Sequence, residues 1–92
     1  MYNNYPKQAS LNAEEGYILN LEKRKCNNQI GVKTAIKLIN RQPISERFLI
    51  KIYSYLSRAK VYVMDHQKCG YISYQLWGGD AMLNWCKKTL KK

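Results

Sequence analysis

Four side chains have the chemistry to hold a metal ion or attack a substrate, namely those of His66, Cys26, Cys69 and Cys86. His66 and Cys69 form one His-x-x-Cys half-motif, whereas a zinc site usually combines two such half-motifs. The same pair could serve as base and nucleophile, but nothing in the pattern supplies an orienting acid or an oxyanion hole. We therefore expect no metal centre, no cofactor and no enzymatic activity.

The three cysteines also bear on the cellular compartment. An odd number at wide spacings is not typical of a disulfide framework, so we expect free thiols in a reducing interior. Cys86 falls on the apolar face of a predicted helix, where free cysteine packs as a small hydrophobe. The polar N-terminus lacks the apolar region of a secretory signal, and no stretch approaches ~18 consecutive apolar residues. We expect no membrane partner.

Positive charge is the strongest chemical signal. Sixteen Lys and Arg against six Asp and Glu give a net charge of +10, which is more than solubility requires. Such a surface attracts phosphate backbones, although a solvated face or an acidic protein neighbour would also explain it. The expected contact residues are Lys33, Lys37, Arg41, Arg47, Lys51, Lys87 and Lys88.

The run Trp77-Gly78-Gly79-Asp80, with Trp85 beyond it, is distinctive. We interpret it as a joint between two helices, with positive φ at the glycines, Asp80 as a helix cap and both indoles in the core. A glycine pair at a helix N-terminus can instead cradle a phosphate, but the Asp80 carboxylate would repel an anion there. The structural interpretation is therefore preferred.

A single small domain must position these residues, because 92 residues bury only a modest core. We expect an N-terminal arm over residues 1–10 and one helical domain over residues 11–92. The first helix is expected from about Leu11 or Asn12 to Lys25, with Asn12 as its N-cap. Its apolar stripe would consist of Leu11, Tyr17, Ile18 and Leu21.

Two further helices are expected on either side of Pro43. The third helix should run from Ser45, its N-cap, to about Ala59, and its wide apolar face makes it central to the core. The second should span residues 32–40 and end before the proline. Its buried face is expected to be Val32, Ala35, Ile36 and Ile39.

The remaining chain is expected to form an extended connection over residues 60–64, a loop over 65–70, and helices over 71–77 and 81–90. The glycine pair would stop the first of these helices, and lysines would load the C-terminal end of the second. The fold class predicted is all-α, a compact bundle of four to five short helices with an extended N-terminal arm.

The second and third helices have roughly the lengths of a helix-turn-helix, in which Arg47, Lys51 and Ser54 would face a DNA groove. Against this, the third helix is apolar over more than half of its surface. It also offers no Asn or Gln on its early exposed face to read adenine. We therefore prefer DNA contact without sequence specificity.

The tyrosines of the predicted arm admit two interpretations. Tyr2 and Tyr5 lie outside the expected helical core, and exposed aromatic rings on an arm suit docking into a neighbouring protein. The alternative is a poorly ordered chain terminus without a binding role.

The segment from Gly70 to Trp85, GYISYQLWGGDAMLNW, resembles the hydrophobic-Trp-Gly-Gly-Asp-x-x-x-x-Trp ending of a small domain in phage and prophage proteins. In that family the ending follows a helix of the type Leu-Ser…Ile-x-(aromatic)-Leu-x-Arg-His. Here that helix runs from Ile44-Ser45 to Arg58, and Ala59 replaces the His, so any role of the His does not transfer. The resemblance spans about Ala13 to Lys88, and its specific part is the run at residues 77–80 with the second Trp.

The family is often attached to phage head proteins such as prohead proteases and portals, or free-standing. The resemblance therefore implies a small basic phage virion or virion-associated structural protein, found in the virion and in the host cytoplasm during assembly. Its partners would be head or portal proteins, with non-specific DNA or an acidic protein against its Lys/Arg face, and the assembly would set its oligomeric state. The alternative is a free-standing DNA-binding or regulatory module of helix-turn-helix type.

Overall fold

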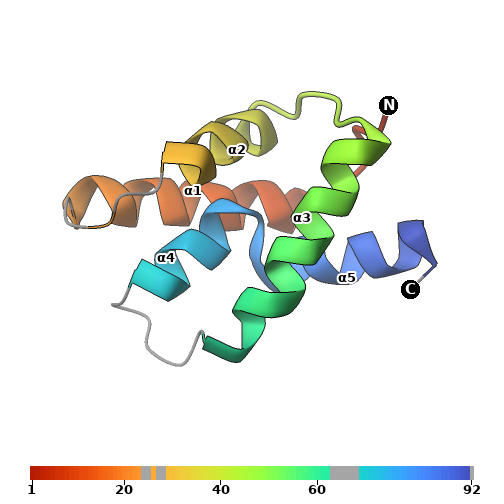
Figure 1. Cartoon of the computed structure of the whole chain (residues 1–92). Helices are drawn as coiled ribbons and strands as arrows, with labels where there is room; N and C mark the ends of the chain where they lie inside the picture. Colours follow the sequence, from red (N-terminus) through yellow and green to blue (C-terminus); the bar gives the residue numbers. More distant parts are fainter. Residues whose placement is uncertain (24–25, 27–28, 63–68, 92) are drawn as a thin grey trace.

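The computed structural model describes residues 1–23, 26, 29–62 and 69–91, and these residues fold into short helices without a named strand. In chain order the helices are α1 (Lys7–Glu22), α2 (Gln29–Ile39), α3 (Glu46–Ala59), the 3₁₀ turn η1 (Lys60–Tyr62), α4 (Cys69–Leu76) and α5 (Gly79–Leu90). The expected all-α bundle is confirmed (Figure 1). Within the described ranges, no helix is long and apolar enough to cross a membrane.

Two helices organise the packing. α1 packs against α2, α4 and α5, and in Figure 1 it runs between α2 and α4. α3 packs against α5, and to a lesser extent against α4 and η1. Although α2 and α3 are consecutive in the chain, α2 packs mainly on α1 and α3 mainly on α5, and the two make no close backbone approach to each other. A hollow between α2 and α3 can therefore be lined by side chains of both.

The bounds of α3 follow the sequence prediction more closely than those of α1 or α2. The Ser45 hydroxyl accepts a hydrogen bond from the Phe48 amide at 3.1 Å, which satisfies one of the free N–H groups of the first turn. Leu49, Ile52 and Leu56 are fully buried and follow the helical period. The expected start and end of this helix are confirmed, and so is most of its inner face, but Ile50, expected to widen that face, is 48% exposed.

α1 differs from the prediction in both ends and in its inner face. It begins at Lys7, directly after Pro6, and ends at Glu22. Asn12 lies inside the helix and donates its side-chain N–H to the Gly78 carbonyl at 2.9 Å, so it is not an N-cap. The predicted stripe faces outward, with Leu11, Ile18 and Leu21 each about half exposed or more, and Tyr17 half-buried. The buried residues are Ala9, Ser10, Ala13 and Gly16.

A close helix crossing explains this inversion. A Cβ atom added at Gly16 would lie 2.6 Å from the backbone nitrogen of Leu76, so α1 and α4 approach almost backbone to backbone. Only a face of small residues can enter such a crossing. The larger side chains of α1 are consequently left on the outside.

α2 is rotated for a similar reason. It begins at Gln29, earlier than expected, and it buries Gly31, Thr34, Ala35 and Leu38, while Val32 and Ile39 are half-buried and Ile36 is 41% exposed. A Cβ atom at Gly31 would lie 3.1 Å from the Leu76 side chain. The small residue therefore faces α4, and the predicted inner face is only partly correct.

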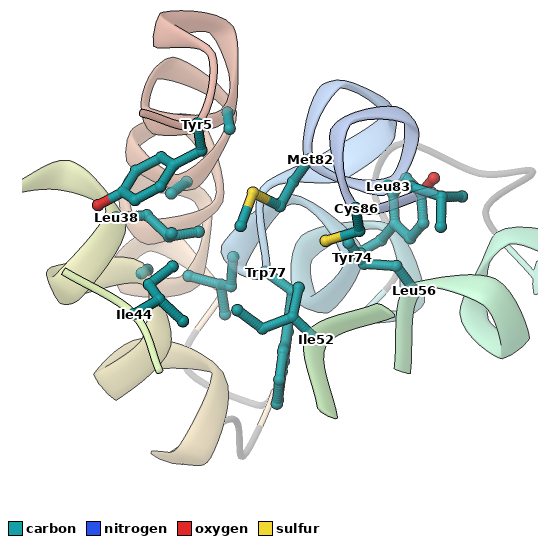
Figure 2. Close-up of a cluster of buried hydrophobic side chains, with 14 of the residues drawn as sticks. Tyr5, Leu38, Ile44, Ile52, Leu56, Tyr74, Trp77, Met82, Leu83 and Cys86 are labelled. Atoms are coloured by element: carbon teal, nitrogen blue, oxygen red, sulfur yellow. The ribbon is translucent and has the colours of Figure 1, made fainter. Parts of the chain in front are cut away.

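The core gathers residues from every α-helix and from the segments between them. Figure 2 shows Leu38 of α2, Ile52 and Leu56 of α3, Trp77, and Met82, Leu83 and Cys86 of α5 converging on one another. All are less than a tenth exposed. A core drawn from so many short helices holds the bundle together through tertiary contacts rather than through helix propensity.

The joint between α4 and α5 forms as the glycine pair predicts, but the N-cap position of α5 is Gly78 and not Asp80. Gly78 (φ 107°) and Gly79 (φ 64°) both occupy the left-handed region, and α5 begins at Gly79. Asp80 does not cap α5 with its side chain; it accepts a hydrogen bond from the Tyr74 hydroxyl and lies 3.4 Å from the Lys60 ammonium. The predicted extended connection is instead a 3₁₀ turn over Lys60–Tyr62, and residues 63–68, with His66, lie outside the described residues.

The first residues do not form a free arm. The Tyr2 backbone makes an antiparallel bridge with Ile44, with two hydrogen bonds of 2.7 Å. Tyr5 is only 1% exposed and donates its hydroxyl proton to the Gln42 carbonyl at 2.8 Å. The prediction of exposed docking tyrosines is therefore wrong, because both rings pack on the domain itself.

The prediction of three free thiols is also wrong. Cys26, ahead of α2, and Cys69, the first residue of α4, form a disulfide with a Cα–Cα distance of 5.5 Å. Their wide separation in sequence concealed their proximity, which arises because α2 and α4 both pack on α1. With Cys26 and Cys69 paired, the cysteines no longer indicate a reducing compartment.

Candidate nucleic-acid interface

One side of α3 carries a row of positively charged side chains, which we call the stripe. Arg47, Lys51, Ser54 and Arg58 follow one another at steps of four, three and four residues, so they share one side of the helix. All four are exposed, and the buried positions of α3 lie on its other side. Arg58 was not among the expected contact residues, although its spacing from Lys51 would have revealed it.

A hollow of about 270 Å³ is lined by Arg58 at one end of this stripe, and two further hollows are each lined by two or more of its cations. The larger, of about 710 Å³, lies where the start of α2 faces α3 and α4. Its lining includes Lys51 and Arg58 with Gln29, Ile30, Gly31, Ser54, Tyr55, Ser73 and Trp77. The smaller, of about 380 Å³, is lined by Lys37, Ser45, Arg47, Phe48 and Lys51. Lys51 borders both hollows, and we refer to the two hollows together as the basic groove along α3.

Aromatic stacking supports this groove from below. The rings of Trp77 and Tyr55 are stacked with centroids 4.5 Å apart and planes 20° apart, and Phe48 lies 6.3 Å from Trp77. The Tyr55 and Ser73 hydroxyls also bond to each other. These contacts tie α3 to α4 and the joint after it, so the cations stand on a rigid base.

Lys37 connects the α2 side to this base. Its ammonium lies 4.7 Å from the centroid of the Phe48 ring, which is a cation–π distance. Among the described residues, the four groove cations Lys37, Arg47, Lys51 and Arg58 form no ion pair. The nearest acid in sequence, Glu46, accepts a hydrogen bond from the Tyr2 hydroxyl at 3.3 Å. The groove is therefore a concentration of uncompensated positive charge.

The structure does not gather the other expected contact residues into this groove. Lys33 is exposed on α2, and Lys87 and Lys88 are exposed in the last turn of α5, but none lines either hollow. Arg41 binds the N-terminal segment instead. Its guanidinium donates to the Pro6 carbonyl at 3.2 Å, to the Ser10 hydroxyl at 2.9 Å and to the Tyr5 carbonyl.

Of the two tryptophans expected in the core, Trp77 lies there and Trp85 packs against its edge. Trp77 is 5% exposed beneath the groove. Trp85 is half-buried, and the rings of Tyr2 and Tyr5 meet it edge-on at 6.1 and 6.0 Å. The Asp80 carboxylate already has hydrogen-bond and charge partners at the joint. That negative charge makes the joint a poor phosphate cradle.

No Cys, Asp or Glu side chain lines either of the two hollows of the groove. The described residues contain no group of three His, Cys, Asp or Glu side chains able to hold a metal ion. Burial raises the pKa of the Cys86 thiol to about 12, so this thiol is protonated and unreactive at neutral pH. The other two cysteines are joined as a disulfide.

Comparisons with known proteins add no relative. No protein family model matches this chain, no curated protein is significantly similar to it, and no solved structure matches its fold. The phage and prophage resemblance of residues 70–85 stays a prediction, and so does the virion setting that it implies.

Proposed function

We propose that this chain is a small basic structural protein of a phage particle, or one associated with the particle, seated beside a head or portal protein. Its α3 face would contact packaged DNA through the phosphate backbone. The observation that carries the proposal is the groove in which Lys37, Arg47, Lys51 and Arg58 converge without an acidic partner among the described residues. The resemblance of the Trp-Gly-Gly-Asp segment supplies the phage setting.

The spacing of the stripe suits a phosphate backbone. From Arg47 to Arg58 the helix rises by roughly 16 Å, at about 1.5 Å per residue. DNA presents one phosphate per strand every ~3.4 Å along its axis, so the stripe spans several phosphates. Flexible cations on a rigid base can neutralise a subset of these in any sequence context.

Contact with phosphates is better supported than base recognition by a helix-turn-helix. The two helices of that motif are joined by a short turn and pack against each other. Here α2 packs on α1 and α3 packs on α5. The segment ERFLIKIYSYLSRA of α3 also holds no Asn or Gln to read adenine. The free-standing regulatory module is thus the weaker alternative.

Mass spectrometry of purified particles tests the virion setting. The protein should be present in mature or immature particles at a stoichiometry above that of trapped host proteins, and its absence from both would remove the proposal. A DNA shift assay titrated with salt separates the two functions. Binding that ignores sequence and weakens with salt supports the structural role, whereas tight sequence-selective binding at physiological salt supports the regulatory module.

A further inference from the structure

The outer face of α1 combines large apolar and acidic side chains in one stripe, with Lys7 on the same face in the first turn. Leu11, Ile18 and Leu21 are 46%, 50% and 61% exposed, and Glu14 and Glu22 are exposed as well. At 100° per residue, these five positions fall within about 100° of the helix circumference, away from the buried small-residue face. A soluble domain normally turns such leucine and isoleucine side chains inward.

Charge sets α1 apart from the rest of the chain. It carries three of the six acidic residues, and the chain as a whole is strongly basic. Glu15 accepts hydrogen bonds from Tyr71 and Gln75, both at 2.7 Å, so it is engaged with α4. Glu14 and Glu22 make no ion pair within the described ranges. A partner for this stripe therefore needs apolar surface bordered by cations.

The chain itself carries a surface of that chemistry. The larger hollow beside α3 exposes Ile30, which is 61% accessible, and is bordered by Lys51 and Arg58. α1 does not pack against α3, so stripe and hollow belong to different parts of the molecule and cannot satisfy each other within one copy. Figure 1 shows α1 (orange) with α2 and α4 beside it, and α3 (green) across the other half of the view.

We propose that copies of this chain associate head to tail, with the α1 stripe of one copy in the larger hollow of the next. Glu14 and Glu22 would face Lys51 and Arg58, and Ile18 and Leu21 would cover Ile30. A symmetric antiparallel α1–α1 contact would pair Lys7 with Glu22, but it would bring the two Glu14 carboxylates together at its centre. A head-to-tail contact produces a ring if its rotation closes and a filament if it does not. In such an assembly Lys51 and Arg58 would be occupied, and Lys37 and Arg47 of the smaller hollow would remain available to DNA.

Complementary charge reversal tests this contact by sedimentation velocity in the absence of nucleic acid. The unmodified chain should form dimers and larger species as concentration rises. Two variants should each associate at least roughly tenfold more weakly than the unmodified chain. They are the groove variant, Lys51→Glu with Arg58→Glu, and the helix variant, Glu14→Lys with Glu22→Lys. Mixing the two variants should restore association, because each then offers the surface that the other has lost. Circular dichroism spectra of the two variants should match that of the unmodified chain, which would show that both variants remain folded.

The control and the contrary results are distinct. Lys87→Glu with Lys88→Glu makes the same charge change as the groove variant at sites that line neither hollow, and it should associate like the unmodified chain. A chain that stays monomeric at millimolar concentration overturns the proposal. So does a groove variant that still dimerises while the helix variant does not, since that indicates an α1–α1 contact. Because Lys51 and Arg58 serve both proposed contacts, association is measured without nucleic acid and DNA affinity at concentrations at which the chain is monomeric, so either proposal can fail alone.

Discussion

The guanidinium of Arg41 lies over the ring of Tyr5, with 4.4 Å between the Arg41 Cζ and the ring centroid. The same guanidinium bonds to backbone carbonyls of residues 5 and 6. Arg41 itself occupies the left-handed region, with φ of 56°. The turn after α2 thus aims one cation at the N-terminal segment, and the charge that the sequence suggested for DNA secures the chain's own first residues.

Replacing Arg41 should therefore reduce stability more than DNA binding. Arg41→Ala removes several charge-assisted hydrogen bonds and a cation–π contact, and should lower the free energy of unfolding by about 2 kcal/mol. Arg41→Lys keeps the charge but loses the planar fork, so it should recover only part of that loss. Urea unfolding measures both effects. If Arg41→Ala weakens DNA binding as much as Arg47→Ala does while the protein stays folded, our assignment of Arg41 is wrong.

The crossing of α1 and α4 should tolerate no added methyl group at Gly16. Its Cβ would meet the Leu76 backbone at 2.6 Å, so Gly16→Ala should cost about 3 kcal/mol despite the better helix propensity of Ala. Gly31→Ala is the matched control, because its Cβ meets a flexible side chain at 3.1 Å. That variant should cost no more than about 1 kcal/mol. Equal thermal stability of the two variants would show that the crossing is looser than described.

The disulfide should contribute substantially to stability. It closes a loop with a sequence separation of 43, for which chain entropy gives about 4 kcal/mol. The variant Cys26→Ser with Cys69→Ser, or the unmodified chain under a reductant, should unfold at lower temperature. Cys86→Ser with the disulfide intact controls for loss of a buried thiol. A mass spectrum of the purified chain that shows three alkylatable thiols without reduction would contradict the pairing.

Alkaline pH should destabilise the fold. Burial, together with the hydrogen bond to Asp80, raises the pKa of the Tyr74 hydroxyl above its ordinary 10.0, and burial raises that of Cys86 from 9.0 to about 12. Above those ordinary values the unfolded chain has released protons that the folded chain retains. Stability is therefore complete below pH 9 and falls as the pH rises further.

Urea midpoints measured from pH 7 to about pH 11 should show this decline. Tyr74→Phe, which has no hydroxyl to ionise, should make the decline shallower. A midpoint that stays constant over the whole range would mean that these groups are not buried as described.

The sequence predicts α3 and the glycine joint because local signals and tertiary packing agree there. Ser45 caps, the apolar period is wide, and the glycine pair has one obvious use. It fails for α1 because the periodicity of large apolar residues points outward, while the buried face consists of small residues that carry little hydrophobic signal. Gly16 lowers the local helix propensity, but a glycine is needed there because α1 crosses α4 too closely for a side chain. No local sequence pattern predicts that crossing.

The candidate site was predicted in part for similar reasons. Charge and helical spacing identify Arg47 and Lys51, and the same spacing extends to Arg58. Charge and spacing do not reveal that the Arg41 side chain turns toward residues 5–10, because this depends on the left-handed backbone of Arg41 itself, after α2. Nor could spacing pair Cys26 with Cys69, because α1 brings their neighbourhoods together.

The salt dependence of duplex DNA affinity tests the basic groove most directly. For the unmodified chain, log Kd against log salt should have a slope corresponding to about three or four released counterions, irrespective of sequence. Arg47→Glu with Lys51→Glu should weaken binding and flatten that slope by about two contacts. Lys7→Glu with Lys23→Glu makes the same charge change at the ends of α1, which does not pack on α3, and should leave most of the slope intact. Equal loss of slope in both variants would contradict a defined interface along α3.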